Sequence, residues 1–153
     1  MKKVIFFTIL IISLVFSNCT AGNPENKIKD PPAKAEVIQL TNETFKKMVY
    51  NYDLNKAWKY EGSKPAIIDF YADWCPPCRQ LSPLVEEIAK EYEGKIVVYK
   101  VNTDKEKGLA QSLGISSLPT LLYIPAKGKP QITLGAVPRE TIVKAINEIL
   151  LTR

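Results

Sequence analysis

The sequence predicts an α/β fold in one domain, with the element order β-α-β-α-β-α-β-β-α. Three observations predict it. Short apolar runs alternate along the chain with segments in which apolar residues recur at helical spacing. The run 65–71 is apolar on both faces, which is typical of a central strand in a parallel arrangement. Towards the C-terminus, two strand-like runs flank the sequence Lys-Gly-Lys at 127–129, which predicts a hairpin.

The first elements lie between residues 37 and 63. Residues 37–40 predict a short strand, and Thr41 predicts the N-cap of the helix that follows. Residues 51–63 carry aromatic side chains among polar ones, at Tyr52, Trp58 and Tyr60. We expect a second short helix that packs these rings on the core, and the alternative is an exposed aromatic patch for a partner.

The later elements continue the alternation. A helix over 80–92 has a regular apolar stripe, contains Pro83, which should kink it, and ends at Gly94. The remaining elements are a strand over 95–102, a helix over 104–113 capped by Gly114, strands over 119–125 and 131–135, and a last helix opened by Pro138.

The composition is that of a soluble globular protein with an additional N-terminal segment. The chain has 153 residues, enough for one domain with a core, and 46% of them are hydrophobic. The formal net charge of +5 is modest and the charges are mixed in sign along the chain, which argues against nucleic-acid binding. The N-terminal segment has two lysines followed by an apolar run over 4–16. This run has the length of a signal-peptide core and is too short to cross a bilayer.

Residues 1–18 are therefore assigned to a signal peptide, and we expect an exported, periplasmic protein. The sequence Phe-Ser-Asn-Cys that ends at Cys19 resembles the lipobox of bacterial lipoproteins, in which the cysteine is lipidated and becomes the new N-terminus. Asn18 departs from that pattern, in which Gly, Ala or Ser is usual. We favour lipidation of Cys19, which would tether the protein to the membrane, and the alternative is plain cleavage after Ala21. Residues 19–36 are polar and proline-containing and predict a flexible linker to a domain over 37–153.

The motif that carries chemistry is Trp74-Cys75-Pro76-Pro77-Cys78, between a predicted strand and a predicted helix. A cysteine at this junction lies at a helix N-terminus, where free backbone N–H groups and the helix dipole favour a thiolate. The second cysteine lies one turn into the helix, close enough to form a disulfide with the first. This arrangement indicates thiol–disulfide exchange, in which Cys75 attacks and Cys78 resolves the mixed disulfide.

Other uses of a Cys-x-x-Cys motif fit less well. A c-type haem site requires a histidine after the second cysteine, but Arg79 stands there and the chain contains no histidine. A four-ligand zinc site requires a second pair of ligands, and Cys19 is the only other cysteine. A carrier for a soft ion such as copper(I), bound by Cys75 and Cys78, remains the alternative from a different functional class.

Asp69 is the unusual residue of the predicted strand 65–71. Its apolar neighbours cover both faces of the strand, so a charged and unpaired carboxylate there would cost several kcal/mol. Asp69 should therefore have a raised pKa or a chemical task. The alternative is a position near the strand end that is open to water.

These features together resemble the thioredoxin family over residues 37–153. The resemblance rests on the Trp-Cys-x-x-Cys motif after the second strand and on Asp69, Pro83, Lys100, Ser117-Leu118-Pro119-Thr120 and Gly135. It implies a central mixed sheet flanked by helices, a cis-proline loop at Pro119 beside the cysteines, and a Lys100 ammonium near the buried Asp69. It also implies that the redox group is the Cys75–Cys78 disulfide itself, with no cofactor and no metal.

The resemblance further implies roles for the site residues. Asp69 would help to deprotonate Cys78 by way of a water. The backbone of Leu118 would pair with an extended substrate segment, and Trp74 would offer an apolar contact over the disulfide. The partners would be proteins that contain disulfides and a membrane-bound or soluble thiol that supplies electrons.

Pro76-Pro77 bears on the direction of the reaction. Typical thioredoxins have Gly-Pro between the cysteines, and Pro-Pro is also found in exported thioredoxin-like reductants, including those that serve cytochrome c maturation. A strong oxidant needs a heavily stabilised thiolate, and the histidine that commonly provides it in the family's oxidases and isomerases is missing here. The sequence therefore predicts an exported protein-disulfide reductase, with a disulfide isomerase or oxidase as the alternative.

Overall fold

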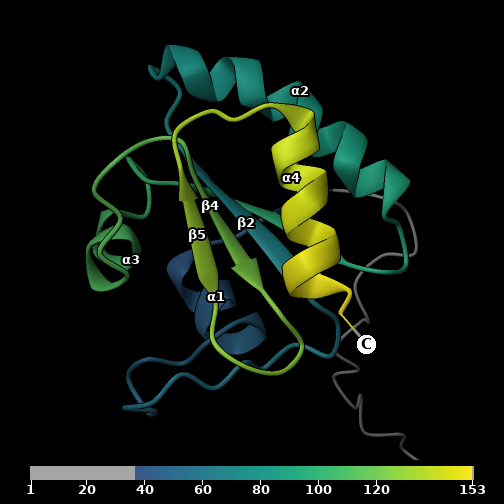
Figure 1. Cartoon of the computed structure of the whole chain (residues 1–153). Coiled ribbons are helices and arrows are strands. Elements are labelled where there is room, and N and C mark those ends of the chain that lie inside the picture. The colour runs from purple at the N-terminus through teal and green to yellow at the C-terminus, as the bar shows by residue number, and fades with distance from the viewer. Residues whose placement is uncertain (1–36, 153) are drawn as a thin grey trace, which may run out of the picture. The chain divides into compact units, whose positions relative to one another are not determined.

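Five strands form one mixed sheet in the order β1-β3-β2-β4-β5. Figure 1 labels β2, β4 and β5 of this sheet. The structure is a computed structural model that describes residues 37–152; the predicted signal peptide, Cys19 and the predicted linker lie outside these residues. The strands are β1 (Ile38–Gln39), β2 (Ala66–Tyr71), β3 (Val97–Asn102), β4 (Thr120–Ile124) and β5 (Gln131–Leu134). β1, β3 and β2 are parallel, and β4 and β5 add to them in antiparallel fashion.

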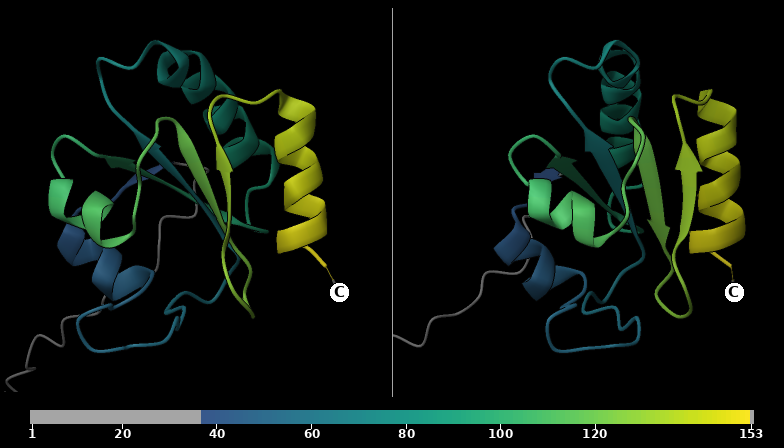
Figure 2. Two further views of the ribbon diagram at one scale, coloured as in Figure 1. Left: turned by 60° about the vertical axis from the view of Figure 1, so that its left-hand side comes forward. Right: turned by 90° about the vertical axis from the view of Figure 1, so that its left-hand side faces the viewer.

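Helices cover both faces of this sheet, as the two views of Figure 2 show. α1 (Asn42–Met48) and α3 (Lys107–Ser112) pack on one face, and α2 (Pro76–Glu91) and α4 (Arg139–Ala145) pack on the other. A π-helical turn, η1 (Ile146–Leu150), continues α4. The predicted element order and the mixed sheet flanked by helices are confirmed, and so is the N-cap at Thr41.

The central strand β2 is buried on both faces because alternate residues of a strand point to opposite sides. Ile67 packs under α2 and α4, whereas Ile68 and Phe70 pack under α1 and α3. Asp69 shares the face of Ile67 and is only 3% exposed. The alternative of an Asp69 that is open to water is therefore wrong, and the expectation of a buried carboxyl is confirmed.

The helix that carries the cysteines begins earlier than predicted. α2 starts at Pro76, with Cys75 as its N-cap, and not at residue 80. Proline suits the first helical turn because its φ is preset and an N–H there would have no helical partner. The helix continues past Pro83, and the turn after it contains Gly94 at φ 78°.

Residues 51–63 contain no helix, contrary to the expectation from the sequence. The side chain of Asn51 accepts hydrogen bonds from the backbone N–H groups of Asp53 and Leu54, and such a local bond favours a turn over a helix. The aromatic side chains nevertheless pack against the core that α1 covers, at Tyr50, Tyr52, Trp58 and Tyr60. The expected packing is confirmed, whereas the alternative of an exposed aromatic patch is not.

Two further helix starts differ from the prediction. α3 begins at Lys107, and not at residue 104, because Asn102 Oδ1 accepts bonds from the two N–H groups that follow Thr103 and holds them in a turn. The last helix begins one residue after Pro138, which is its N-cap, and its closing π-helical turn was not predicted.

Candidate active site

Cys75 and Cys78 form a disulfide, with their Cα atoms 5.3 Å apart. Both cysteines are almost fully buried. Cys75 is the N-cap of α2, and its Sγ accepts a hydrogen bond of 3.3 Å from the backbone N–H of Cys78. The N-terminus of α2 therefore directs an amide at the Cys75 sulfur, where the positive end of the helix dipole favours a thiolate after reduction.

The two prolines limit how many amides can reach that sulfur. A capping side chain accepts from the second or third N–H of its helix. Pro76 and Pro77 occupy the first two positions and have no N–H, so the third residue, Cys78, is the donor. Arg79 does not donate to that sulfur: its guanidinium donates to the backbone carbonyl of Asp73, and the hydrogen bond to Cys75 Sγ comes from Cys78. The Cys75 sulfur is thus left with one backbone donor from the first turn of α2.

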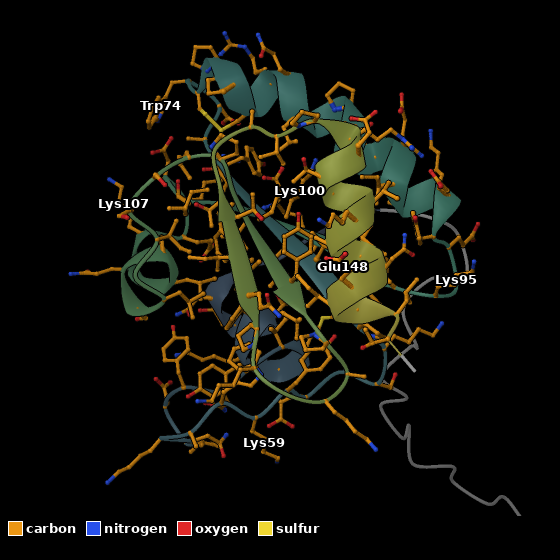
Figure 3. All side chains as sticks on the ribbon, viewed as in Figure 1. Lys59, Trp74, Lys95, Lys100, Lys107 and Glu148 are labelled. Carbon is orange, nitrogen blue, oxygen red and sulfur yellow. A yellow bond between two sulfur atoms is a disulfide. The ribbon has the colours of Figure 1, made fainter. Side chains whose placement is uncertain are left out.

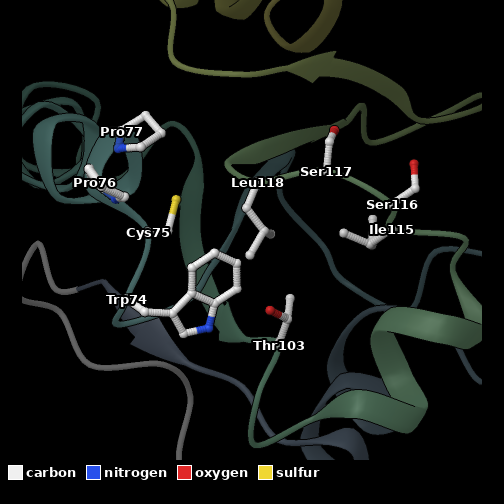
Figure 4. Close-up of a pocket in the computed structure, with 9 residues that line it drawn as sticks. All are labelled: Trp74, Cys75, Pro76, Pro77, Thr103, Ile115, Ser116, Ser117 and Leu118. Carbon is white, nitrogen blue, oxygen red and sulfur yellow. The ribbon is translucent and has the colours of Figure 1, made fainter.

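A pocket of about 360 Å³ opens beside the disulfide (Figure 4). Its lining carries no charged side chain and consists of Trp74, Cys75, Pro76, Pro77, Thr103, Ile115, Ser116, Ser117 and Leu118. Cys75 belongs to this lining and Cys78 does not, so one sulfur faces the pocket. Trp74 is 67% exposed. Figure 4 shows its indole and the Leu118 side chain facing the same space as the Cys75 sulfur.

The segment from Ile115 to Leu118 is held in place by hydrogen bonds of Pro119 and Thr120, the two residues that follow it. The Leu118–Pro119 peptide bond is cis, as the resemblance implied. Pro119 O accepts a bond of 2.8 Å from the N–H of Gly135, and Thr120 Oγ1 donates to the carbonyl of Ser117 at 2.7 Å. Leu118 packs against the buried cluster of Ala72, Cys75 and Cys78, and its N–H and C=O have no backbone partner within residues 37–152. The loop therefore presents a free peptide edge next to the disulfide.

Asp69 lies on the face of β2 that α2 covers. On that face Ile67 packs under α2 and Tyr71 packs against the disulfide cluster, and Asp69 stands between them. Burial raises the pKa of Asp69 to about 7, and the positive charge of Lys100 opposes that rise. Lys100 is the register partner of Asp69 on β3, so the two side chains share a face. A carboxyl with this pKa can accept and return a proton near neutral pH.

Asn102 is a site residue that sequence reasoning missed. Its side chain is 1% exposed and bridges two loops: Nδ2 donates to the Asp73 carboxylate, and Oδ1 holds the turn after Thr103. Thr103 and Ile115, which line the pocket, were also not singled out. An asparagine at a strand end followed by polar residues indicates a turn, but nothing local identifies Asp73 as its partner.

Among residues 37–152, no three His, Cys, Asp or Glu side chains gather into a group that could hold a metal ion. Within the same range, no helix combines the length and the apolar character needed to cross a membrane.

Comparison with known proteins agrees with this geometry. The family model Thioredoxin matches residues 36–148. The chain is 45% identical over 111 residues to thioredoxin of Borreliella burgdorferi, which covers 72% of this chain and 95% of that protein. It is 41% identical over 112 residues to thioredoxin 1 of Nostoc sp., with 73% and 95% covered.

The chain belongs to the thioredoxin family. A solved structure, that of chloroplastic thioredoxin z, matches with a TM-score of 0.64 at 27% identity and covers 74% of this chain and 94% of that one. With the Cys75–Cys78 disulfide at the start of α2, this thioredoxin-family protein is a thiol–disulfide oxidoreductase whose redox group is its own cysteine pair.

Proposed function

We propose that this protein is an exported reductase of protein disulfides. The first turn of α2 supports reduction, and not oxidation, of the substrate. There Pro76 and Pro77 leave the N–H of Cys78 as the backbone donor to Cys75. Among thiol–disulfide oxidoreductases, a strong oxidant has a high reduction potential because its reduced form is stabilised. With one amide donor and no histidine in the chain, the reduced form here is less favoured, so the dithiol gives up its electrons more readily.

Cys75 is the nucleophile in the proposed reaction. Its place in the pocket lining, from which Cys78 is absent, supports this assignment. The Cys75 thiolate attacks one sulfur of the substrate disulfide, and the S–S bond of the substrate breaks. The departing sulfur leaves as a thiolate and takes up a proton, while a mixed disulfide joins Cys75 to the other substrate sulfur.

Cys78 then resolves the mixed disulfide. Asp69, by way of a water, takes the proton of the Cys78 thiol, for which a pKa of about 7 is suited at neutral pH. The Cys78 thiolate attacks the Cys75 sulfur, the Cys75–Cys78 disulfide closes, and the second substrate sulfur leaves and is protonated. Two electrons have passed to the substrate, and a thiol donor must return them to the protein.

The proposed substrate is an extended segment of a protein chain around a disulfide. The unpaired N–H and C=O of Leu118, beside Pro119, can pair with such a segment in the manner of an added strand. Trp74 and the uncharged pocket would take up apolar side chains next to the substrate cysteine.

Export is proposed from the N-terminal sequence. The apolar run over 4–16 has the features of a signal-peptide core, and lipidation of Cys19 would tether the domain through the linker 19–36. An extracytoplasmic reductase of this kind would draw its electrons from a thiol donor at or near the membrane.

The equilibrium reduction potential of the Cys75–Cys78 couple, measured in glutathione buffers, tests the direction. We expect a value nearer to about −270 mV, that of thioredoxin, than to about −120 mV, that of a strong oxidant. A value above about −180 mV, that of protein disulfide isomerase, would contradict the reductase proposal. A copper(I) titration of the reduced protein tests the alternative of a metal carrier.

A further inference from the structure

Tyr71 has contacts that the mechanism above does not use. Its ring centroid lies 5.8 Å from Nζ of Lys100, and its hydroxyl donates a hydrogen bond of 3.1 Å to Oε1 of Gln39. The same half-buried side chain packs against the buried cluster that Ala72, Cys75 and Cys78 form. Tyr71 therefore lies between the cluster that contains the disulfide, the lysine beside Asp69 and the edge strand β1.

These residues form a polar row across the sheet. Lys100 on β3 is the register partner of Gln39 on β1 and of Asp69 on β2. Side chains of register partners point to the same face, and Tyr71, two residues after Asp69, points there as well. Lys100 is labelled in Figure 3. On that face the Lys100 ammonium therefore has two neighbouring groups that it could contact, the carboxyl of Asp69 and the ring of Tyr71.

The Lys100 ammonium is engaged with the ring. No ion pair within 4.0 Å joins Lys100 to another residue of the described chain, and Oδ1 of Asp69 has no hydrogen-bond partner there. An ammonium near the face of an aromatic ring is attracted by the electron density of that face. The bond from Tyr71 to Gln39 fixes the tyrosine side chain against β1.

We propose that Tyr71 is a positioning residue whose ring holds the Lys100 ammonium and so leaves the Asp69 carboxyl without an ion-pair partner. If the ammonium were free to turn to Asp69, an ion pair would stabilise the carboxylate and lower the pKa of Asp69 by about 1–3 units. Asp69 would then be a weaker base near neutral pH. This inference rests on the proposed role of Asp69 in proton transfer from Cys78.

The other charged groups around Asp69 face elsewhere. On α2 and α4 they are exposed, at Arg79, Glu86, Glu87, Lys90, Glu91, Arg139, Glu140 and Lys144. On β4, the register partner of Asp69 is the apolar Leu121, and Tyr123 lies opposite Ile67. Cys75 and Cys78 do not titrate while they form the disulfide. Lys100 is therefore the charge through which Tyr71 can act on Asp69.

Titration of the Asp69 carboxyl, followed by the NMR shift of its carboxyl carbon in the oxidised full-length chain, tests the proposal. Tyr71→Leu removes the ring, and we expect the midpoint to fall by about one unit or more. Tyr71→Phe is the matched control, because it keeps the ring and removes the bond to Gln39; its midpoint should stay within about half a unit of the wild type. Tyr71→Met serves as a second ring-free variant if Tyr71→Leu does not fold.

A double variant distinguishes the effect of the Lys100 ammonium on the Asp69 midpoint from the effect of water that could enter the space left by the ring. In a Lys100→Met background, Tyr71→Leu should leave the midpoint unchanged, because no ammonium is present to be released. An equal fall in both backgrounds would overturn the proposal in favour of hydration of Asp69. An unchanged midpoint in the presence of Lys100 would overturn it as well. Since the titration uses the oxidised form, a reduction potential that contradicts the reductase proposal would not alter its outcome.

Discussion

Nδ2 of Asn102 donates a hydrogen bond of 3.2 Å to the carboxylate of Asp73, which lies 29 residues earlier in the chain. Oδ1 of the same side chain accepts from the backbone of the turn after Thr103. Trp74 and Thr103 are the next residues along the chain from the two partners, and both line the pocket beside the disulfide. One buried amide therefore holds two walls of the pocket together.

Replacing this amide should loosen the pocket without changing the disulfide. Asn102→Asp keeps the acceptor for the turn but places a second carboxylate against Asp73, and we expect a loss of about 1–3 kcal/mol in the free energy of unfolding. The KM for a protein disulfide should rise, while the reduction potential stays unchanged. Combining Asn102→Asp with Asp73→Asn reverses donor and acceptor and should restore both quantities. If the pair of substitutions is no better than Asn102→Asp alone, the link is not what shapes the pocket.

The reduction potential should respond to Pro77 more than to Pro76. Pro77→Ala adds an N–H at the second helical position, from which it can donate to the Cys75 sulfur. A hydrogen bond to a charged group contributes about 1.5–3 kcal/mol, which corresponds to a rise of roughly 30–60 mV for this two-electron couple. Pro77→His adds an imidazole as well and should raise the potential further. Pro76→Ala is the control, and an equal shift there would argue against the amide as the cause.

The two cysteines should behave differently when each is replaced. Cys75→Ser removes the sulfur that faces the pocket and should abolish exchange, whereas Cys78→Ser should accumulate mixed disulfides through Cys75 because the resolving thiol is missing. Non-reducing electrophoresis and mass spectrometry of the trapped adducts check this. Faster alkylation of Cys78 than of Cys75 in the reduced protein near neutral pH would reverse the assigned roles.

Asp69 should make the oxidised protein less stable as the pH rises. Its pKa is about 7 when folded and 3.8 in the unfolded reference, so the folded state holds the proton more tightly. The contribution of Asp69 to the free energy of unfolding is fully present below about pH 4 and is lost as the pH rises to about 7. Relative to wild type, Asp69→Asn should gain on the order of 4 kcal/mol between these limits, since one pKa unit corresponds to about 1.4 kcal/mol. Parallel stability profiles in urea unfolding from pH 4 to 8 would contradict this.

The N-terminal proposal is tested by cell fractionation. Cys19→Ala should release a soluble form if Cys19 is lipidated, and the wild-type protein should remain with the membrane. A matched Ser17→Ala variant, which keeps the cysteine, should stay membrane-bound. A wild-type protein that already fractionates as soluble would favour cleavage after Ala21.

Much of the fold could be predicted because it depends on local patterns. The alternation of strand and helix, the N-cap at Thr41 and the burial of Asp69 all follow from residues a few positions apart. The predicted first residues of the helices were wrong where two local signals compete. Asn51 and Asn102 each hold a turn through their side chains. Pro76 and Pro77 begin α2, although the sequence alone equally allowed a helix that begins after the Cys-x-x-Cys motif.

The sequence by itself therefore determined the order of the elements, the cysteine pair at a helix N-terminus and the buried carboxyl in the central strand, because periodicity and capping are properties of neighbouring residues. Only the tertiary structure decided that Tyr71 contacts Lys100 and Gln39, and that Asn102 binds Asp73. These partners lie about 30 residues apart along the chain. Their contact depends on the register of β1, β2 and β3, which is set when the whole sheet forms and which no short stretch of sequence encodes.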